Sequence, residues 1–149
     1  MPADDPATPP GITLRLVPDT RLYIGRAGNQ SVTVDRAAGY AGGTGSGVRG
    51  GQLLGMAIGA CLGNSLQEIA AETDACLQDV SIDVTMTPNE AGTRILGATL
   101  DIAIMADLPR AELEALLEKS LSIWTVALSI RDSLPVTLRS ITLNGTTVD

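Results

Sequence analysis

The stretch GGQLLGMAIGACLGNSLQEIAAE, residues 50–72, decides the fold. No residue between Arg49 and Glu68 carries a formal charge. Apolar side chains fall on every side of a helix drawn through this stretch: Leu53, Leu54, Met56, Ala57, Ile58, Ala60, Cys61, Leu62, Leu66 and Ile69. A helix that is apolar all round has to be buried all round. The sequence therefore predicts a long central helix in the interior, with one candidate nucleophile, Cys61, near its middle.

A membrane-spanning helix is the alternative interpretation of this segment. Such a helix needs about 20 predominantly apolar residues, whereas the apolar run here extends only over residues 53–63 before Asn64 and Ser65 follow. We therefore expect no membrane span. The N-terminal MPADDPATPP is acidic and rich in proline, so we expect residues 1–11 to be a disordered tail rather than a targeting peptide.

The composition limits the chemistry that the chain can perform. Its 149 residues fit one domain, and the core must be aliphatic because there is no Phe and only one Trp. The net charge of −7 argues against nucleic acid and anionic lipid, so we expect a small molecule or a second copy as partner. There is no His, the commonest metal ligand, and the two cysteines lack the spacing of a metal pair. We expect no metal and no cofactor.

Alternating apolar residues predict strands on both sides of the central helix. Before the helix they are expected at residues 12–17, 21–24 and 31–35, and after it at residues 80–87 and 96–104. The last strand is expected between Pro135 and Leu143, with a bulge near Arg139 and Ser140 where the alternation slips by one residue.

Two helices are expected between the fifth and the sixth strand. The first starts at residues 107–109, and the second extends from a capping Ser122 to about Ile130, with Trp124 in the core or in the wall of a pocket that the Leu121 side also lines. The predicted fold class is α+β, with two antiparallel sheet halves around the central helix. One domain is expected over residues 12–143, followed by a C-terminal tail over residues 144–149.

The segment GYAGGTGSGVRGG, residues 39–51, contains seven glycines. Because glycine gives up much backbone entropy on ordering, this segment is expected to be a mobile connector. The functional alternative is a lid over the site that the central helix presents.

A helix buried on all sides needs more cover than the strands of one chain provide, so we expect an obligate homodimer with the two central helices close together. The cysteines, Cys61 and Cys76, would lie about 22 Å apart on one helix at about 1.5 Å rise per residue, too far for a disulfide. We expect both to be free thiols in the cytoplasm.

Two local patterns resemble the OsmC/Ohr family of cytoplasmic thiol-dependent hydroperoxide reductases. GGQLLGMAIGACLGNSL, residues 50–66, is similar to the family's helix start followed by a small-residue step to Cys and a Leu about five positions beyond it. LSIWTVAL, residues 121–128, looks like the segment that in the family begins Cys-Pro-Val. The resemblance covers residues 12–143 and implies an OsmC-like α+β fold that forms an intertwined dimer.

The resemblance also implies roles for individual residues. Cys61 becomes the peroxidatic cysteine, whereas Leu121 stands where the family has its resolving cysteine and Gly51 where it has an activating Glu. The activating Arg comes from the first hairpin region, where Arg21 is the best placed and Arg26 the second choice. A divergent member is therefore expected, with one thiol and one Arg of the catalytic set.

Two functional hypotheses follow. The first is a stress-response enzyme that reduces a small organic hydroperoxide at Cys61, with weak or one-cysteine chemistry recycled by an external thiol. Cys61 would then need a cation beside the sulfur, supplied by Arg21, Arg26 or Arg49, because the thiolate is the reactive form. In the second, Cys61 is a small core residue and the protein is a non-enzymatic binder of a hydrophobic ligand in the pocket at the dimer interface.

Overall fold

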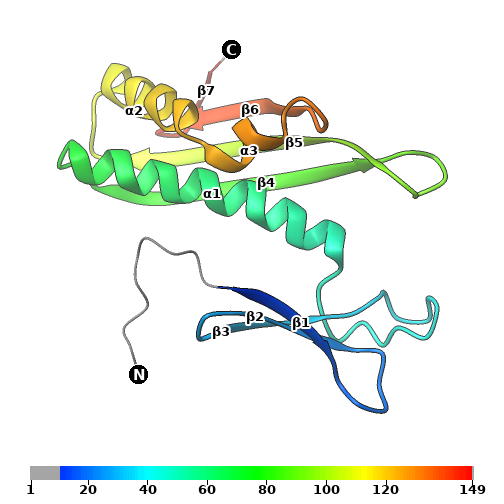
Figure 1. The fold of residues 1–149 in the computed structure, drawn as a ribbon. Coiled ribbons are helices and arrows are strands. Elements are labelled where there is room, and N and C mark those ends of the chain that lie inside the picture. Colours follow the sequence, from blue (N-terminus) through cyan, green and yellow to red (C-terminus); the bar gives the residue numbers. More distant parts are fainter. Residues whose placement is uncertain (1–10, 149) are drawn as a thin grey trace. The chain divides into compact units, whose positions relative to one another are not determined.

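The central helix α1 spans Gly50–Glu72 in the computed structural model of the protein, which describes residues 11–148 (Figure 1). The predicted bounds of this helix are confirmed. Chain contacts divide the protein into two compact units, Met1–Leu53 and Leu54–Asp149. The tail expected over residues 1–11 lies almost entirely outside the described residues.

The N-terminal unit contains an antiparallel sheet of three strands in the order β1-β2-β3. The strands are β1 (Ile12–Leu16), β2 (Tyr23–Ala27) and β3 (Gln30–Val34). β2 begins later than the predicted residue 21, because the Thr20 hydroxyl donates to Val17 O at 2.8 Å and accepts from Leu22 N at 3.0 Å. This turn holds residues 17–22 out of the strand.

One face of this small sheet is apolar and is not covered by the described residues of the N-terminal unit. Ile12, Leu14 and Leu16 are 76%, 55% and 52% exposed, and their cross-strand partners on β2 are Ala27, Gly25 and Tyr23. The opposite face carries Thr13, Arg15 and Arg26 by alternation. The sheet therefore has one apolar and one polar face, as a sheet that packs against a core does. Nothing in the described part of the N-terminal unit covers its apolar face.

The glycine-rich segment is an ordered loop folded around Asp35, contrary to the expected mobile connector. The buried carboxylate of Asp35 accepts from the Thr44 amide at 2.9 Å, the Thr44 hydroxyl at 2.7 Å and the Ser46 amide at 3.0 Å. The Arg36 amide donates to the other carboxylate oxygen at 2.7 Å. At the end of the loop Val48 forms a parallel bridge with Val34 of β3. These bonds offset the backbone entropy that glycine gives up.

The C-terminal unit places helices on a sheet of four strands in the order β4-β5-β6-β7. After α1 its elements are β4 (Leu77–Pro88), β5 (Ile95–Ala106), α2 (Arg110–Ser122), α3 (Thr125–Ile130), β6 (Val136–Leu143) and β7 (Thr146–Val148). The fold class is α+β, as predicted. The bulge near Arg139 is confirmed, because the register between β5 and β6 shifts between Leu100 and Asp101.

Three details of the prediction are wrong. β5 and β6 pair in parallel, so the second sheet is mixed; α2 and α3 between these strands make the long crossover that parallel pairing requires. Thr146–Val148 is not tail but strand β7, paired with β6 through the turn at Asn144 and Gly145. Ser122 closes α2 by donating to Lys119 O at 2.6 Å, and α3 starts only after Trp124.

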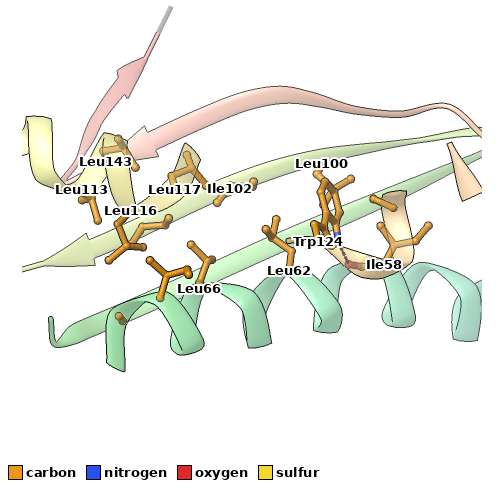
Figure 2. Packing of buried hydrophobic residues seen from close by; sticks show 14 of the residues in the cluster. Ile58, Leu62, Leu66, Leu100, Ile102, Leu113, Leu116, Leu117, Trp124 and Leu143 are labelled. Carbon is orange, nitrogen blue, oxygen red and sulfur yellow. Dashed lines mark hydrogen bonds between the residues drawn. The ribbon is translucent and has the colours of Figure 1, made fainter. Parts of the chain in front are cut away.

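The core of the C-terminal unit lies between the helices and one face of its sheet (Figure 2). Ile58, Leu62 and Leu66 of α1 are 0% exposed, as are Leu100 and Ile104 of β5. The other side of α1 is not covered within the described part of the C-terminal unit, with Met56 55% exposed. Complete burial of α1 is therefore seen on one side only, and the predicted second copy stays a prediction.

Glycines bring α1 close to β4. A Cβ atom placed on Gly59 would lie 3.0 Å from Val84 Cγ2, and one on Gly55 would lie 3.4 Å from the Met86 sulfur. On Gly63, one turn further, the nearest such contact is 3.8 Å.

Among residues 11–148, none of the helices has the length and hydrophobicity that a membrane crossing requires.

Candidate functional site

Cys61 is half-buried on α1, and its sulfur faces the start of α3. The Val126 amide donates a hydrogen bond to Cys61 Sγ at 3.5 Å. Val126 is the second residue of α3, and the first amides of a helix have no partner within the helix. The thiol sulfur therefore receives a backbone donor that would otherwise be unpaired.

Trp124 fixes the start of α3 against α1. Its side chain is 5% exposed, and its indole N–H donates to Ile58 O at 2.9 Å, the bond drawn in Figure 2. Ile58 lies one turn before Cys61 on the same helix. The expected core position of Trp124 is confirmed, and its hydrogen bond links the residue directly before α3 to α1.

The positions that the resemblance singled out supply no second thiol and no carboxylate. Leu121 is half-buried at the end of α2 and packs against the core. Gly51 has no side chain, and the first turn of α1 holds no acidic residue. Cys76 is exposed and lies after the end of α1, so the two cysteines do not share a helix as supposed; both are free.

The candidate cations Arg21 and Arg26 belong to the N-terminal unit, whereas Cys61 belongs to the C-terminal unit. Both arginines are exposed, and neither forms an ion pair within residues 11–148. Arg26 is on β2 between Thr13 and Ser31. The Arg21 side chain lies on the backbone of Gly42, where a Cβ atom would come within 2.6 Å of Arg21 Cδ. The pairing of either arginine with Cys61 stays a prediction.

Arg49, the third candidate, takes part in capping α1. Its amide donates to the Gln52 side-chain oxygen at 2.9 Å, and its Nε lies 3.5 Å from the same atom. In a capping box, the side chain at the third helical position accepts a hydrogen bond from the amide of the capping residue, and this bond is half of such a box. Arg49 is thus placed at the start of the helix by a local bond.

Asp35 is the buried group that sequence reasoning missed. The hydrogen bond from the Thr44 hydroxyl, with the amides of Ser46, Arg36 and Thr44, lowers the pKa of Asp35 to about 2 against the opposing effect of burial. The available signal was an Asp directly after a strand, followed by Thr and Ser in a glycine-rich segment, since Asp side chains bond nearby backbone amides in turns.

The described part of the chain offers no metal site. Between residues 11 and 148, no three His, Cys, Asp or Glu side chains lie close enough together to hold an ion. Within these residues the candidate nucleophiles are the free thiols of Cys61 and Cys76, and a backbone donor lies beside the Cys61 sulfur.

The fold and the thiol together define an α+β protein with a half-buried cysteine on its central helix. Residues 43–139 match the family described as OsmC-like protein, well over half of the 149-residue chain, so the chain belongs to the OsmC-like family. Among curated protein sequences, none matches this chain.

Solved structures share the fold at low sequence identity. The OsmC-like protein of Mycoplasma pneumoniae has a TM-score of 0.75 at 15% identity, with 92% of this chain and 98% of that chain covered. The organic hydroperoxide resistance protein OsmC of Legionella pneumophila has a TM-score of 0.62 at 18% identity, covering 89% and 96%. The organic hydroperoxide resistance protein OhrB of Bacillus subtilis has a TM-score of 0.59 at 20% identity, with 90% of this chain and 96% of that chain covered.

Proposed function

We propose that the protein reduces small organic hydroperoxides at Cys61 as a stress-response enzyme of the cytoplasm. The observation that carries this proposal is the Val126 amide directed at Cys61 Sγ, 3.5 Å away. The amide places a backbone donor beside the sulfur that would attack the peroxide, and the attacking form of a cysteine is the thiolate. Membership of a family that includes organic hydroperoxide resistance proteins supports the choice of substrate.

The reaction needs one cysteine and an external thiol. The Cys61 thiolate attacks the O–O bond, an S–O bond forms, and the alkoxide leaves and takes a proton to become an alcohol. The sulfenic acid product condenses with a small thiol, with loss of water, to a mixed disulfide. A second small thiol attacks the outer sulfur, which releases the disulfide of the reductant and regenerates Cys61.

An internal resolving step is disfavoured by the residues around the thiol. Leu121 stands at the expected resolving position, and Cys76 is exposed outside the helix that carries Cys61. We assign the cation that assists the thiolate to Arg21, with Arg26 as second choice. The guanidinium would stabilise the negative charge that passes from sulfur to the leaving oxygen.

Intact-mass spectrometry after mixing the reduced protein with cumene hydroperoxide tests the proposal. We expect a species heavier by one oxygen in the wild type and in Cys76→Ser, and none in Cys61→Ser. Addition of cysteine should then convert the sulfenic acid to a mixed disulfide and restore the thiol. Oxidation confined to Cys76, or equal in the Cys61→Ser variant, would contradict it.

We also propose that the protein is a homodimer. Each unit has an apolar side without cover, with Ile12 76% and Leu14 55% exposed in one and Met56 55% exposed in the other. In sedimentation equilibrium we expect a dimer at micromolar concentration. Leu14→Asp should produce monomer, whereas Thr13→Asp, on the opposite face of the same strand, should not.

A second candidate function is the binding of a hydrophobic ligand without catalysis. An apolar hollow of about 270 Å³ lies over Gly25 in the N-terminal unit, lined by Ile12, Leu14, Val32, Val34 and Leu53 among others. The neutral fluorophore N-phenyl-1-naphthylamine should bind there if this candidate is right. Gly25→Val would then abolish binding, because even a Cβ would lie 3.1 Å from Val32 Cγ1, while Gly11→Val would not, since nothing lies within 4 Å of it.

A further inference from the structure

The loop over residues 35–48 is held in one conformation by close packing as well as by Asp35. A Cβ atom on Gly43 would lie 2.6 Å from Ala37 O, and one on Gly47 would lie 2.5 Å from Thr33 O. The Gly45 amide donates to Arg36 O at 3.1 Å, and the Val48 amide donates to Thr33 O at 3.0 Å. The backbone therefore contacts both itself and β3, which leaves little freedom at its tip.

That tip carries Gly42, and the Arg21 side chain lies directly on it. A Cβ atom at Gly42 would be 2.6 Å from Arg21 Cδ and 3.1 Å from Arg21 Cζ. The other arginine at the loop, Arg36, has its guanidinium carbon 5.7 Å from the centre of the Tyr40 ring and does not share this position. The absence of a side chain at Gly42 thus leaves a space that Arg21 fills, the arginine assigned as first choice for the thiol chemistry.

We propose that this loop is a seat that sets the position of the Arg21 guanidinium, with Asp35 and Gly42 as positioning residues. Asp35 fixes the loop through the amides of Thr44 and Ser46, and Gly42 leaves the space that the arginine fills. The inference rests on the proposed function, because it explains how an exposed arginine is kept in place for the Cys61 thiolate.

Two glycines of the loop provide a matched test. Gly42 and Gly39 have φ angles of 78° and 76°, so alanine causes the same backbone strain at both. Nothing lies within 4 Å of a Cβ at Gly39, whereas a Cβ at Gly42 would displace Arg21. Only the second change should therefore alter the arginine.

The first readout is independent of activity. In ¹⁵N NMR of the wild type we expect slow exchange for the Thr44 and Ser46 amides and one resolved Arg21 Nε–H signal. Gly42→Ala should shift that signal and Gly39→Ala should not. Asp35→Asn should speed the exchange of both amides and shift the Arg21 signal. Equal effects of the two glycine variants, or an Arg21 signal unaffected by Asp35→Asn, would overturn the inference.

The second readout is the rate at which cumene hydroperoxide oxidises Cys61. Gly42→Ala should slow it about tenfold, the change that about 1.36 kcal/mol of lost stabilisation produces. In an Arg21→Ala background the same substitution should have no further effect, since a positioning residue acts only through the group it positions. An equal slowing in that background would show a merely structural role and contradict the inference.

If the wild-type thiol fails to react at all, the proposed function is wrong. The seat for Arg21 is then decided by the NMR comparison of Gly42→Ala, Gly39→Ala and Asp35→Asn alone.

Discussion

The two units of this chain are stabilised in different ways. In the C-terminal unit, Ile58, Leu62 and Leu66 of α1 are 0% exposed against one face of a four-stranded sheet. In the N-terminal unit, Ile12 and Leu14 are more than half exposed, and the buried group is the charged Asp35. One unit is stabilised by its own aliphatic core, and the other by hydrogen bonds to a carboxylate. The difference indicates that the N-terminal unit depends on further cover for its apolar face.

The largest effect is expected in the aliphatic core. Leu62→Ala removes a side chain that is 0% exposed and should lower the free energy of unfolding by about 2–5 kcal/mol, because the cavity adds to the lost transfer energy. Met56→Ala, on the side of the same helix that the proposed second copy would cover, should lower it by less than Leu62→Ala but by more than the about 0.5 kcal/mol of a free surface position. Urea unfolding followed by circular dichroism measures both. A loss at Met56 within about 0.5 kcal/mol would mean that this side of α1 is free in solution.

A smaller effect separates two glycines of α1. Gly63→Ala should raise the free energy of unfolding by about 0.5–1 kcal/mol, since alanine is the better helix former and its Cβ meets only an ordinary contact at 3.8 Å. At Gly59 the Cβ would meet Val84 Cγ2 at 3.0 Å, and overpacking costs about 1–3 kcal/mol. Gly59→Ala should therefore be the less stable of the two. Equal gains in the urea midpoint would show that β4 yields to the helix.

The same contrast explains how much the sequence could predict. The bounds of α1 and the alternation in β4 and β5 were predictable, because an aliphatic core leaves a regular apolar pattern. The bulge at Arg139 was predictable for the same reason. The parallel pairing of β5 with β6 was not, because the pattern of a strand gives its faces but not the direction of its neighbour.

The candidate site was only partly predictable. Cys61 stood out as a thiol on an apolar helix, but its partner is the Val126 amide, and backbone donors leave no mark in a sequence. The order of the glycine-rich loop also escaped prediction, because it depends on four donors that converge on Asp35 from residues up to eleven positions away. Hydrogen-bond convergence of this kind is a property of the folded chain.

The third prediction concerns the charged group of the N-terminal unit. Asp35 has its pKa lowered from 3.8 to about 2, first by the Thr44 hydroxyl. A carboxyl whose pKa is lowered in the folded state stabilises the protein at pH values above the pKa that it has in the unfolded chain. That stabilisation is lost as the pH falls from about 4 towards 2. Thr44→Val should raise the pKa of Asp35 back towards 3.8 and leave the pKa of Asp101 unchanged. Carboxyl ¹³C NMR over a pH titration measures both. No movement would mean that the backbone amides alone hold the carboxylate.

The smallest effect is expected at the charged group of the C-terminal unit. Asp101 of β5 has its pKa lowered from 3.8 to about 2, first by the hydrogen bond from Arg139 and then by that from Ser140. Arg139→Ala should raise the Asp101 pKa, all the more because Asp83 lies directly opposite on β4.

Salt distinguishes the two carboxylates. The Arg139 side chain is 60% exposed, so 1 M NaCl should screen its ion pair with Asp101 and raise the pKa of Asp101. The pKa of Asp35 should change less, because the groups that bond to its carboxylate are neutral. Arg94→Ala, which removes an exposed arginine without an ion pair in the described residues, is the control. Equal salt shifts at Asp35 and Asp101 would show that charge, and not hydrogen bonding, governs both units. The N-terminal loop would then be held by the charge of Asp35 rather than by the hydrogen bonds to its carboxylate.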